Sequence, residues 1–128
     1  MFSHVVIFWT DPANPNAAEQ LIAGAQKYLV PIPGVKMFHI GKMVGSHRSV
    51  VDQTYQIALN LVFDTKQQQD DYQVHPLHLE FIEQAFKPNC KKVVVYDCQE
   101  ATRRRAKPGC ERAPGAGGEG GTARRREG

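Results

Sequence analysis

The first strand-like stretch of the chain, residues 2–9, is largely apolar. Successive side chains of a strand point to opposite faces, which places His4, Val6 and Phe8 on one face. The opposite face, formed by residues 5, 7 and 9, is also apolar. A strand that is apolar on both faces is expected to be covered on both.

The next apolar residues recur at helical spacing and predict one amphipathic helix. Asn14 can cap this helix and Pro15 can open it, because proline is well tolerated at the first helical position. Pro31, Pro33 and Gly34 end it. Its apolar stripe consists of Ala17, Ala18, Leu21, Ile22, Ala25, Tyr28 and Leu29.

The rest of the first hundred residues adds three strands and a second helical segment. Residues 55–63 alternate most clearly, and a polar connection separates them from the preceding strand. The expected elements are strands over 35–43, 55–63 and 92–98 and a broken helix from 64 or 65 to about 87. The resulting order βαββαβ predicts an α+β fold, a ferredoxin-like two-layer sandwich.

The second face of this sheet needs a partner. Helices cover only one face of such a sandwich, yet the first strand and residues 93–96 of the last are apolar on both faces. A second copy of the same sheet is the simplest cover. The pattern therefore predicts a homodimer whose sheets pack face to face, a dimeric α+β barrel.

The run DDYQVHPLHLEF gathers one phenol and two imidazoles around a proline. A helix through Tyr72 should break near His75, with Pro76 at the first position of a new helix. His78 and Phe81 then lie three residues apart and share a face. If that face looks inward, a titratable ring lies beside an aromatic wall, which suits proton transfer or ligand binding.

Composition divides the 128 residues into two parts. Residues 1–100 hold eight Lys and Arg against ten Asp and Glu, whereas residues 101–128 hold eight against three. We interpret 1–100 as one domain. The basic Gly- and Arg-rich tail, 101–128, is expected to be disordered, a cloning scar or a read-through product. The alternative is a tether to nucleic acid or an anionic surface, although the tail lacks aromatic residues that stack on bases.

Cysteine spacing, hydropathy and the lack of known motifs bear on the compartment of the protein, on membrane insertion and on cofactor binding. Cys90, Cys98 and Cys110 lack metal-type spacing, and the first two are expected to flank one strand, too far apart to pair. A reducing, cytoplasmic compartment is the simplest interpretation. No apolar run approaches the ~20 residues of a membrane span, and no secretory leader is apparent. No phosphate loop, nucleophile elbow or dinucleotide fingerprint indicates a cofactor, and no metal is expected.

Three segments of the sequence resemble the Dabb family, the stress-responsive α/β-barrel domain. They are HVVIFW at residues 4–9, IPGV at residues 32–35 and YQVHPLHLEF at residues 72–81, of which the last is the most specific. The likeness covers about residues 1–98. It implies a ferredoxin-like sandwich that dimerises into an α+β barrel, in agreement with the pattern above.

The resemblance also implies roles for particular residues. In olivetolic acid cyclase-like members of the family, Tyr72 and His78 match an acid/base pair that closes a polyketide by aldol condensation. His4 matches a pocket histidine of those members. The expected ligand contacts are His4, Val6, Phe8, Leu21, Ile22, Ala25 and Phe81, where the three helix residues replace a bulky aromatic wall of the cyclase.

Two functions remain open at this point. The first is a stress-responsive-type dimer that binds a small apolar or carbonyl-containing molecule without established catalysis. The second is a cofactor-free polyketide cyclase or isomerase in which His78 and Tyr72 move protons beside a carbonyl. His78 and His4 each have a structural alternative. His78 could stabilise the helix break, and His4 could be a core residue whose ring is hydrogen-bonded within the protein.

Overall fold

The first strand, β1 (Phe2–Thr10), lies at the centre of a four-stranded antiparallel sheet. The computed structural model describes residues 1–101, so the predictions for the tail and for Cys110 lie outside the described part of the chain. The strand order is β2-β3-β1-β4, built from β2 (Met37–Lys42), β3 (Ile57–Phe63) and β4 (Cys90–Gln99). This order and the βαββαβ succession are those of the predicted ferredoxin-like α+β fold.

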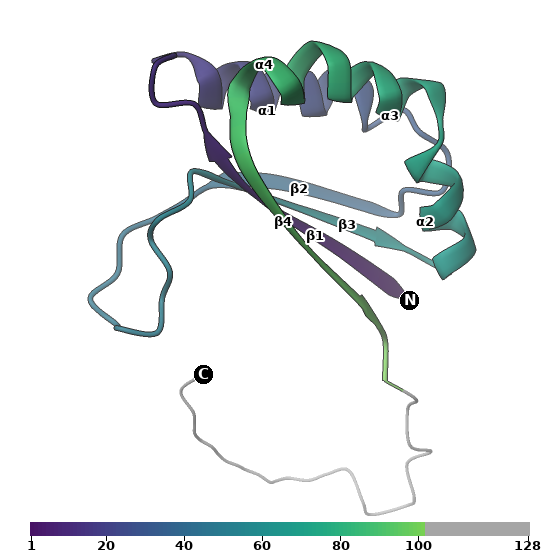
Figure 1. Cartoon of the computed structure of the whole chain (residues 1–128). Coiled ribbons are helices and arrows are strands. Elements are labelled where there is room, and N and C mark those ends of the chain that lie inside the picture. Colours follow the sequence, from purple (N-terminus) through teal and green to yellow (C-terminus); the bar gives the residue numbers. More distant parts are fainter. Residues whose placement is uncertain (102–128) are drawn as a thin grey trace, which may run out of the picture.

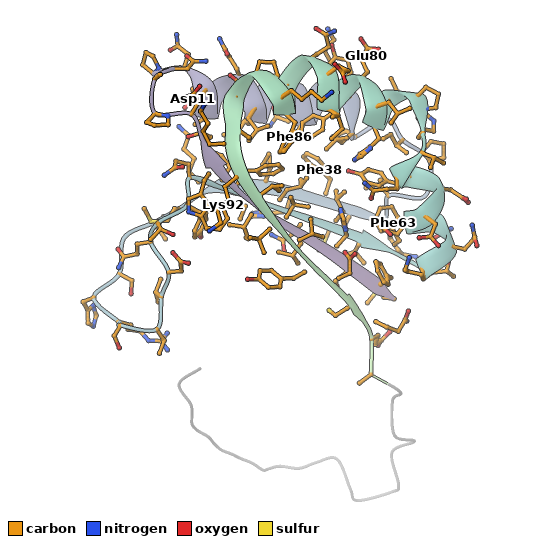
Figure 2. The ribbon with its side chains drawn as sticks, viewed as in Figure 1. Asp11, Phe38, Phe63, Glu80, Phe86 and Lys92 are labelled. Carbon is orange, nitrogen blue, oxygen red and sulfur yellow. The ribbon has the colours of Figure 1, made fainter. Side chains whose placement is uncertain are left out.

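All the helices lie on one side of the sheet (Figure 1). They are α1 (Ala17–Tyr28), α2 (Lys66–Gln73), α3 (Pro76–Phe81), the π-helix η1 (Ile82–Phe86) and the short α4 (Lys87–Asn89). Side chains fill the space between the layers: Phe86 points from the helical layer toward the sheet, whereas Glu80 points away from it (Figure 2). The core therefore lies between the helices and one sheet face.

The start of α1 differs from the prediction, whereas the start of α2 agrees with it. The first helix begins later than expected, with Asn16 at its N-cap position and no side-chain hydrogen bond there. Asn14 instead accepts from the backbone N–H of Asn16 through its side-chain oxygen, which stabilises the turn before the helix. The cap of α2 agrees with the prediction, because Thr65 forms a complete capping box with Gln68.

Alternation in β1 and β3 sorts their residues as predicted. Phe2, His4, Val6 and Phe8 are buried against the helices, and so are the four inward residues of β3. The outward residues of both strands are only half-buried. The inward set forms one continuous core with α1, α2, α3 and η1.

The last strand is far less covered than its neighbours. In β4 most residues are exposed, including Val95 and Tyr96, at 47% and 62%. Cross-strand pairs of an antiparallel sheet share a face, so the pairing of Val6 with Val95 places Val95 on the helix side. The helical layer thus stops short of this edge, and the gap leads into the interior.

Candidate functional site

A pocket of about 210 Å³ lies between the helical layer and the β4 edge of the sheet. Residues from three strands and from the second helical segment line it, and most of them are apolar. The lining residues are His4, Val6, Phe8, Leu59, Tyr72, Gln73, His78, Phe81, Ile82, Phe86, Val93 and Val95. The structure therefore brings together four of the predicted contacts and both members of the predicted acid/base pair.

The broken helix positions the polar side chains of this pocket. Helix α2 ends at Gln73, and His75 takes the N-cap position of α3 in an extended conformation. Its Nδ1 accepts from the backbone N–H of Leu77 at 3.0 Å, so this ring stabilises the start of α3 and has a structural role. Pro76 starts the new helix, which turns His78 and Phe81 inward.

Tyr72 lies at the centre of an aromatic cluster. It is 2% exposed, and its ring centroid lies 5.3 Å from that of Phe63, 5.8 Å from that of His4 and 4.8 Å from that of His78. Within residues 1–101 its hydroxyl group forms no hydrogen bond. Burial raises the pKa of Tyr72 above its usual range, so the phenol keeps its proton at neutral pH.

His78 is buried beside Tyr72, with 7% of its surface exposed. Its Nδ1 has no hydrogen-bond partner among the described residues, and its Nε2 lies 3.5 Å from Nε2 of Gln73. Burial lowers the pKa of His78; the backbone of Gln73 acts in the opposite sense, and His4 adds to the lowering. The imidazole is therefore neutral at neutral pH and able to accept a proton.

His4 reaches the same pocket from β1 and pairs with Asp97 of β4. Its Nδ1 lies 2.5 Å from Oδ1 of Asp97, and the two residues are direct partners in the sheet register. His4 itself is 5% exposed. A carboxylate on one ring nitrogen fixes the ring's orientation and tautomer. Both proposed roles of His4, core residue and pocket residue, are compatible with this placement.

Three predicted ligand contacts lie elsewhere. Leu21 and Ala25 on α1 are fully buried in the core, and Ile22 packs partly buried against it. None of the three lines this pocket. The reason is that α1 contacts β2 at one edge of the sheet, while the pocket lies at the opposite edge, beside β4.

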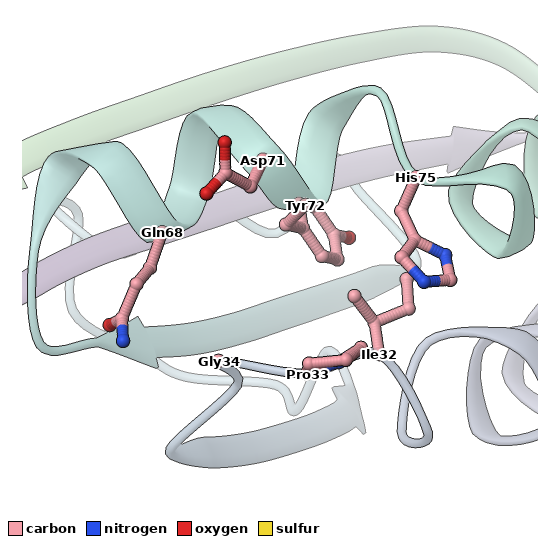
Figure 3. Close-up of a pocket in the computed structure, with 7 residues that line it drawn as sticks. All are labelled: Ile32, Pro33, Gly34, Gln68, Asp71, Tyr72 and His75. Carbon is pink, nitrogen blue, oxygen red and sulfur yellow. The ribbon is translucent and has the colours of Figure 1, made fainter.

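A second hollow of about 290 Å³ lies on the other side of Tyr72 (Figure 3). The α1–β2 loop and helix α2 line it through Ile32, Pro33, Gly34, Gln68, Asp71, Tyr72 and His75. Asp71 is exposed and accepts from the side chain of Gln67. Tyr72 thus separates two hollows, of which only the one at β4 also contains His78 and His4.

Sequence reasoning missed several residues in and around the pocket. It singled out neither Gln73, which lines the pocket, nor Asp97 and Gln69, which contact the pocket residue His4. Val93 and Val95 were recognised as apolar, but the sequence did not show which face of the last strand they occupy. Only the register of β4 against β1 could have revealed that these two valines and Asp97 face the helices.

The described residues form neither a metal-binding cluster nor a membrane-spanning helix. Within residues 1–101, no group of three or more His, Cys, Asp and Glu side chains lies where it could hold a metal ion. Over the same range, no helix combines the length and the apolar character needed to cross a bilayer. Cys90 and Cys98 are both free thiols.

The fold and this pocket define a small ferredoxin-like α+β protein with an apolar site between its sheet and its helices. Residues 2–100 match the model of the Dabb family, the stress responsive A/B barrel domain. The chain belongs to this family. None of the curated proteins matches the sequence.

Solved structures share the fold. The protein At3g17210 from Arabidopsis thaliana is 28% identical, with a TM-score of 0.66 over 81% of this chain and 99% of that one. A hydroxynitrile lyase from Passiflora edulis is 20% identical, with a TM-score of 0.68 over 80% and 95%. A dimeric ferredoxin-like protein of unknown function from Thermobifida fusca is 22% identical, with a TM-score of 0.63 over 76% and 88%.

Proposed function

We propose that this protein binds a small, largely apolar molecule carrying a carbonyl or similar oxygen in the pocket at β4. The observation that carries the proposal is Nδ1 of His78, a buried atom with no hydrogen-bond partner among the described residues, which lies beside Tyr72 in an otherwise apolar wall. A buried polar atom without a partner costs about 1–3 kcal/mol, and a polar group on a ligand would offset that cost. Apolar walls with a few polar groups are typical of small-molecule sites.

The volume of the pocket narrows the ligand class. Sites for drug-sized ligands usually measure about 300–1,000 Å³. The pocket at β4, at about 210 Å³, is smaller. It therefore suits a single aromatic ring or a short aliphatic chain better than an extended polyketide.

A titration with 2-hexanone and benzaldehyde tests this binding site. Backbone amide NMR signals of Val6, Phe81 and Val95 should shift in a saturable manner. Val95→Trp fills the pocket mouth and should abolish the shifts, while Val74→Trp, at an exposed position outside the pocket, should leave them unchanged. Tyr72→Phe should weaken binding about 5- to 10-fold, as expected for the loss of one buried hydrogen bond. Absence of saturable shifts with both probes would reject the proposal.

Proton transfer beside a carbonyl is the second candidate. It is favoured by the neutral imidazole of His78, whose ring centroid lies 4.8 Å from that of a protonated phenol. His78 would take a proton from the carbon next to the carbonyl. The electron pair of that C–H bond would move to the carbonyl oxygen, where Tyr72 donates a hydrogen bond, and return of the proton from His78 would restore the ketone.

Deuterium exchange distinguishes catalysis from binding alone. In deuterated buffer, the protein should accelerate the replacement of the α-protons of 2-hexanone, measured by proton NMR. His78→Ala should remove the acceleration, whereas His39→Ala, on the exposed strand β2, should keep it. Saturable binding without accelerated exchange would leave the binding function and reject the catalytic one.

A homodimer joined through the open sheet face completes the proposed function. Support comes from the apolar side chains on that face and from the dimeric state of the Thermobifida fusca protein. We further propose a reducing, cytoplasmic location, since Cys90 and Cys98 are free.

A further inference from the structure

Two glutamines of α2 join the two pocket histidines in a chain of side-chain contacts. Asp97 pairs with His4, Gln69 lies between His4 and Gln73, and Gln73 reaches His78. Gln69 is 4% exposed, so its amide belongs to the interior. Gln73 lines the pocket itself. The two residues are one helical turn apart, which brings their amides together.

The hydrogen bond between the two glutamines fixes how Gln73 is turned. Nε2 of Gln69 donates to Oε1 of Gln73 at 2.7 Å. Because its oxygen is engaged there, Gln73 presents its nitrogen to the imidazole, with 3.5 Å between Nε2 of Gln73 and Nε2 of His78. An amide nitrogen donates and cannot accept. It therefore favours a ring nitrogen that carries a lone pair.

His4, at the other end of this series of side-chain contacts, does not accept a hydrogen bond from Gln69. Nδ1–H of His4 donates to Oδ1 of Asp97 at 2.5 Å, so this nitrogen has no lone pair that could accept from Gln69. The 3.5 Å contact between Gln69 and His4 is a packing contact. The amide of Gln69 is consequently left to orient Gln73.

We propose that Gln73, oriented by Gln69, is a positioning residue that holds neutral His78 in the tautomer protonated on Nδ1. Nε2 is then the proton acceptor of the site. The consequence for catalysis rests on the function proposed above, because it names Nε2 as the atom that would take a substrate proton.

The tautomer of His78 in the ligand-free protein tests this inference directly. Nitrogen-15 NMR of the imidazole ring should show Nδ1 protonated and Nε2 unprotonated at a pH where His78 is neutral. Gln73→Leu removes the donor at similar volume, and the Nδ1-protonated fraction should fall below half. Gln67→Leu, an equivalent change on the exposed side of α2, should leave the tautomer as in the wild type.

A charge-bearing variant reverses the effect. Gln73→Glu places an acceptor opposite Nε2, so the proton should move to that nitrogen and His78 should titrate at a higher pH. The other titratable groups facing this ring are Tyr72 from α2 and His4 from β1, and both are unchanged in the variant. A wild-type ring protonated on Nε2, or a tautomer unaffected by Gln73→Leu, would overturn the inference. Neither readout uses a ligand, so failure of the binding proposal remains a separate result.

Discussion

At the scale of single residues, His78 links the pocket to the stability of the protein. Burial lowers the pKa of its imidazole below the unfolded value of 6.5. Below about pH 6.5 the unfolded chain therefore binds a proton that the folded chain resists, and the free energy of unfolding falls as pH falls. This contribution is fully present above the unfolded pKa and is lost as the pH decreases toward the folded one.

We predict that wild-type protein loses more unfolding free energy than His78→Gln between about pH 7.5 and about pH 5. Urea denaturation at several pH values measures the difference. His39→Gln serves as the control, since His39 is exposed on β2, and it should follow the wild type. Parallel curves for wild type and His78→Gln would show that the folded protein accommodates the charged ring, for instance by opening the pocket.

Residues with a distinctive sequence context could be predicted, and residues that depend on register could not. The spacing of Tyr72, Pro76 and His78 predicted the helix break, which the structure confirms. It left open whether His78 faces inward, and the structure shows that it is buried. Asp97 carries no comparable signal, because it joins His4 across 93 residues of sequence through strand pairing alone. Gln73 is similar, since a glutamine on a polar helix face looks the same whether or not an imidazole lies beside it.

At the scale of elements, the helical layer depends on one close approach between α1 and η1. A Cβ atom built on Gly24 would lie 2.3 Å from Cβ of Ala85, far inside van der Waals contact. Glycine at this point lets the two backbones come together over the core. The position therefore matters for packing, although α1 contributes nothing to the pocket lining.

We predict that Gly24→Ala destabilises the protein by about 1–3 kcal/mol, as overpacking does. Ala85→Gly should cost about 1 kcal/mol through helix propensity. Combining the two restores the space, so the double variant should be more stable than the sum of the single effects predicts. Thermal or urea denaturation of the four proteins measures this coupling, and strict additivity would contradict the contact.

Periodicity in the sequence predicted whether a segment is a helix or a strand more reliably than it predicted where the segment begins and ends. A largely apolar run located β1, alternation located β3, and the apolar stripe located α1. The predicted second strand began at residue 35, two residues before β2, because the apolar pattern continues past the paired segment. The π-helix η1 was not predicted, because its wider turn has no distinct apolar spacing in the sequence. Single π-helical turns of this kind are common at functional sites.

At the scale of the whole molecule, the sheet has one face under its helices and one face open (Figure 1). The open face carries Val5 and Ile7 of β1, both half-buried, beside Val94 and the exposed Tyr96 of β4. A contiguous apolar surface of this kind usually marks an interaction site. A second copy meeting it face to face would bury the same residues twice through two-fold symmetry.

Opposite faces of β4 provide a matched test of this assembly. Val94 pairs with Ile7 on the open face, and its neighbour Val93 pairs with Phe8 on the helix side. We predict that the wild-type chain is a dimer at micromolar concentration by size exclusion with light scattering. Val94→Glu should convert it to a folded monomer, because an unpaired carboxylate in an apolar interface is strongly unfavourable. Val93→Glu should stay dimeric and instead lose binding of 2-hexanone. A dimer that survives Val94→Glu, or a wild-type monomer, would place the contact elsewhere or remove it.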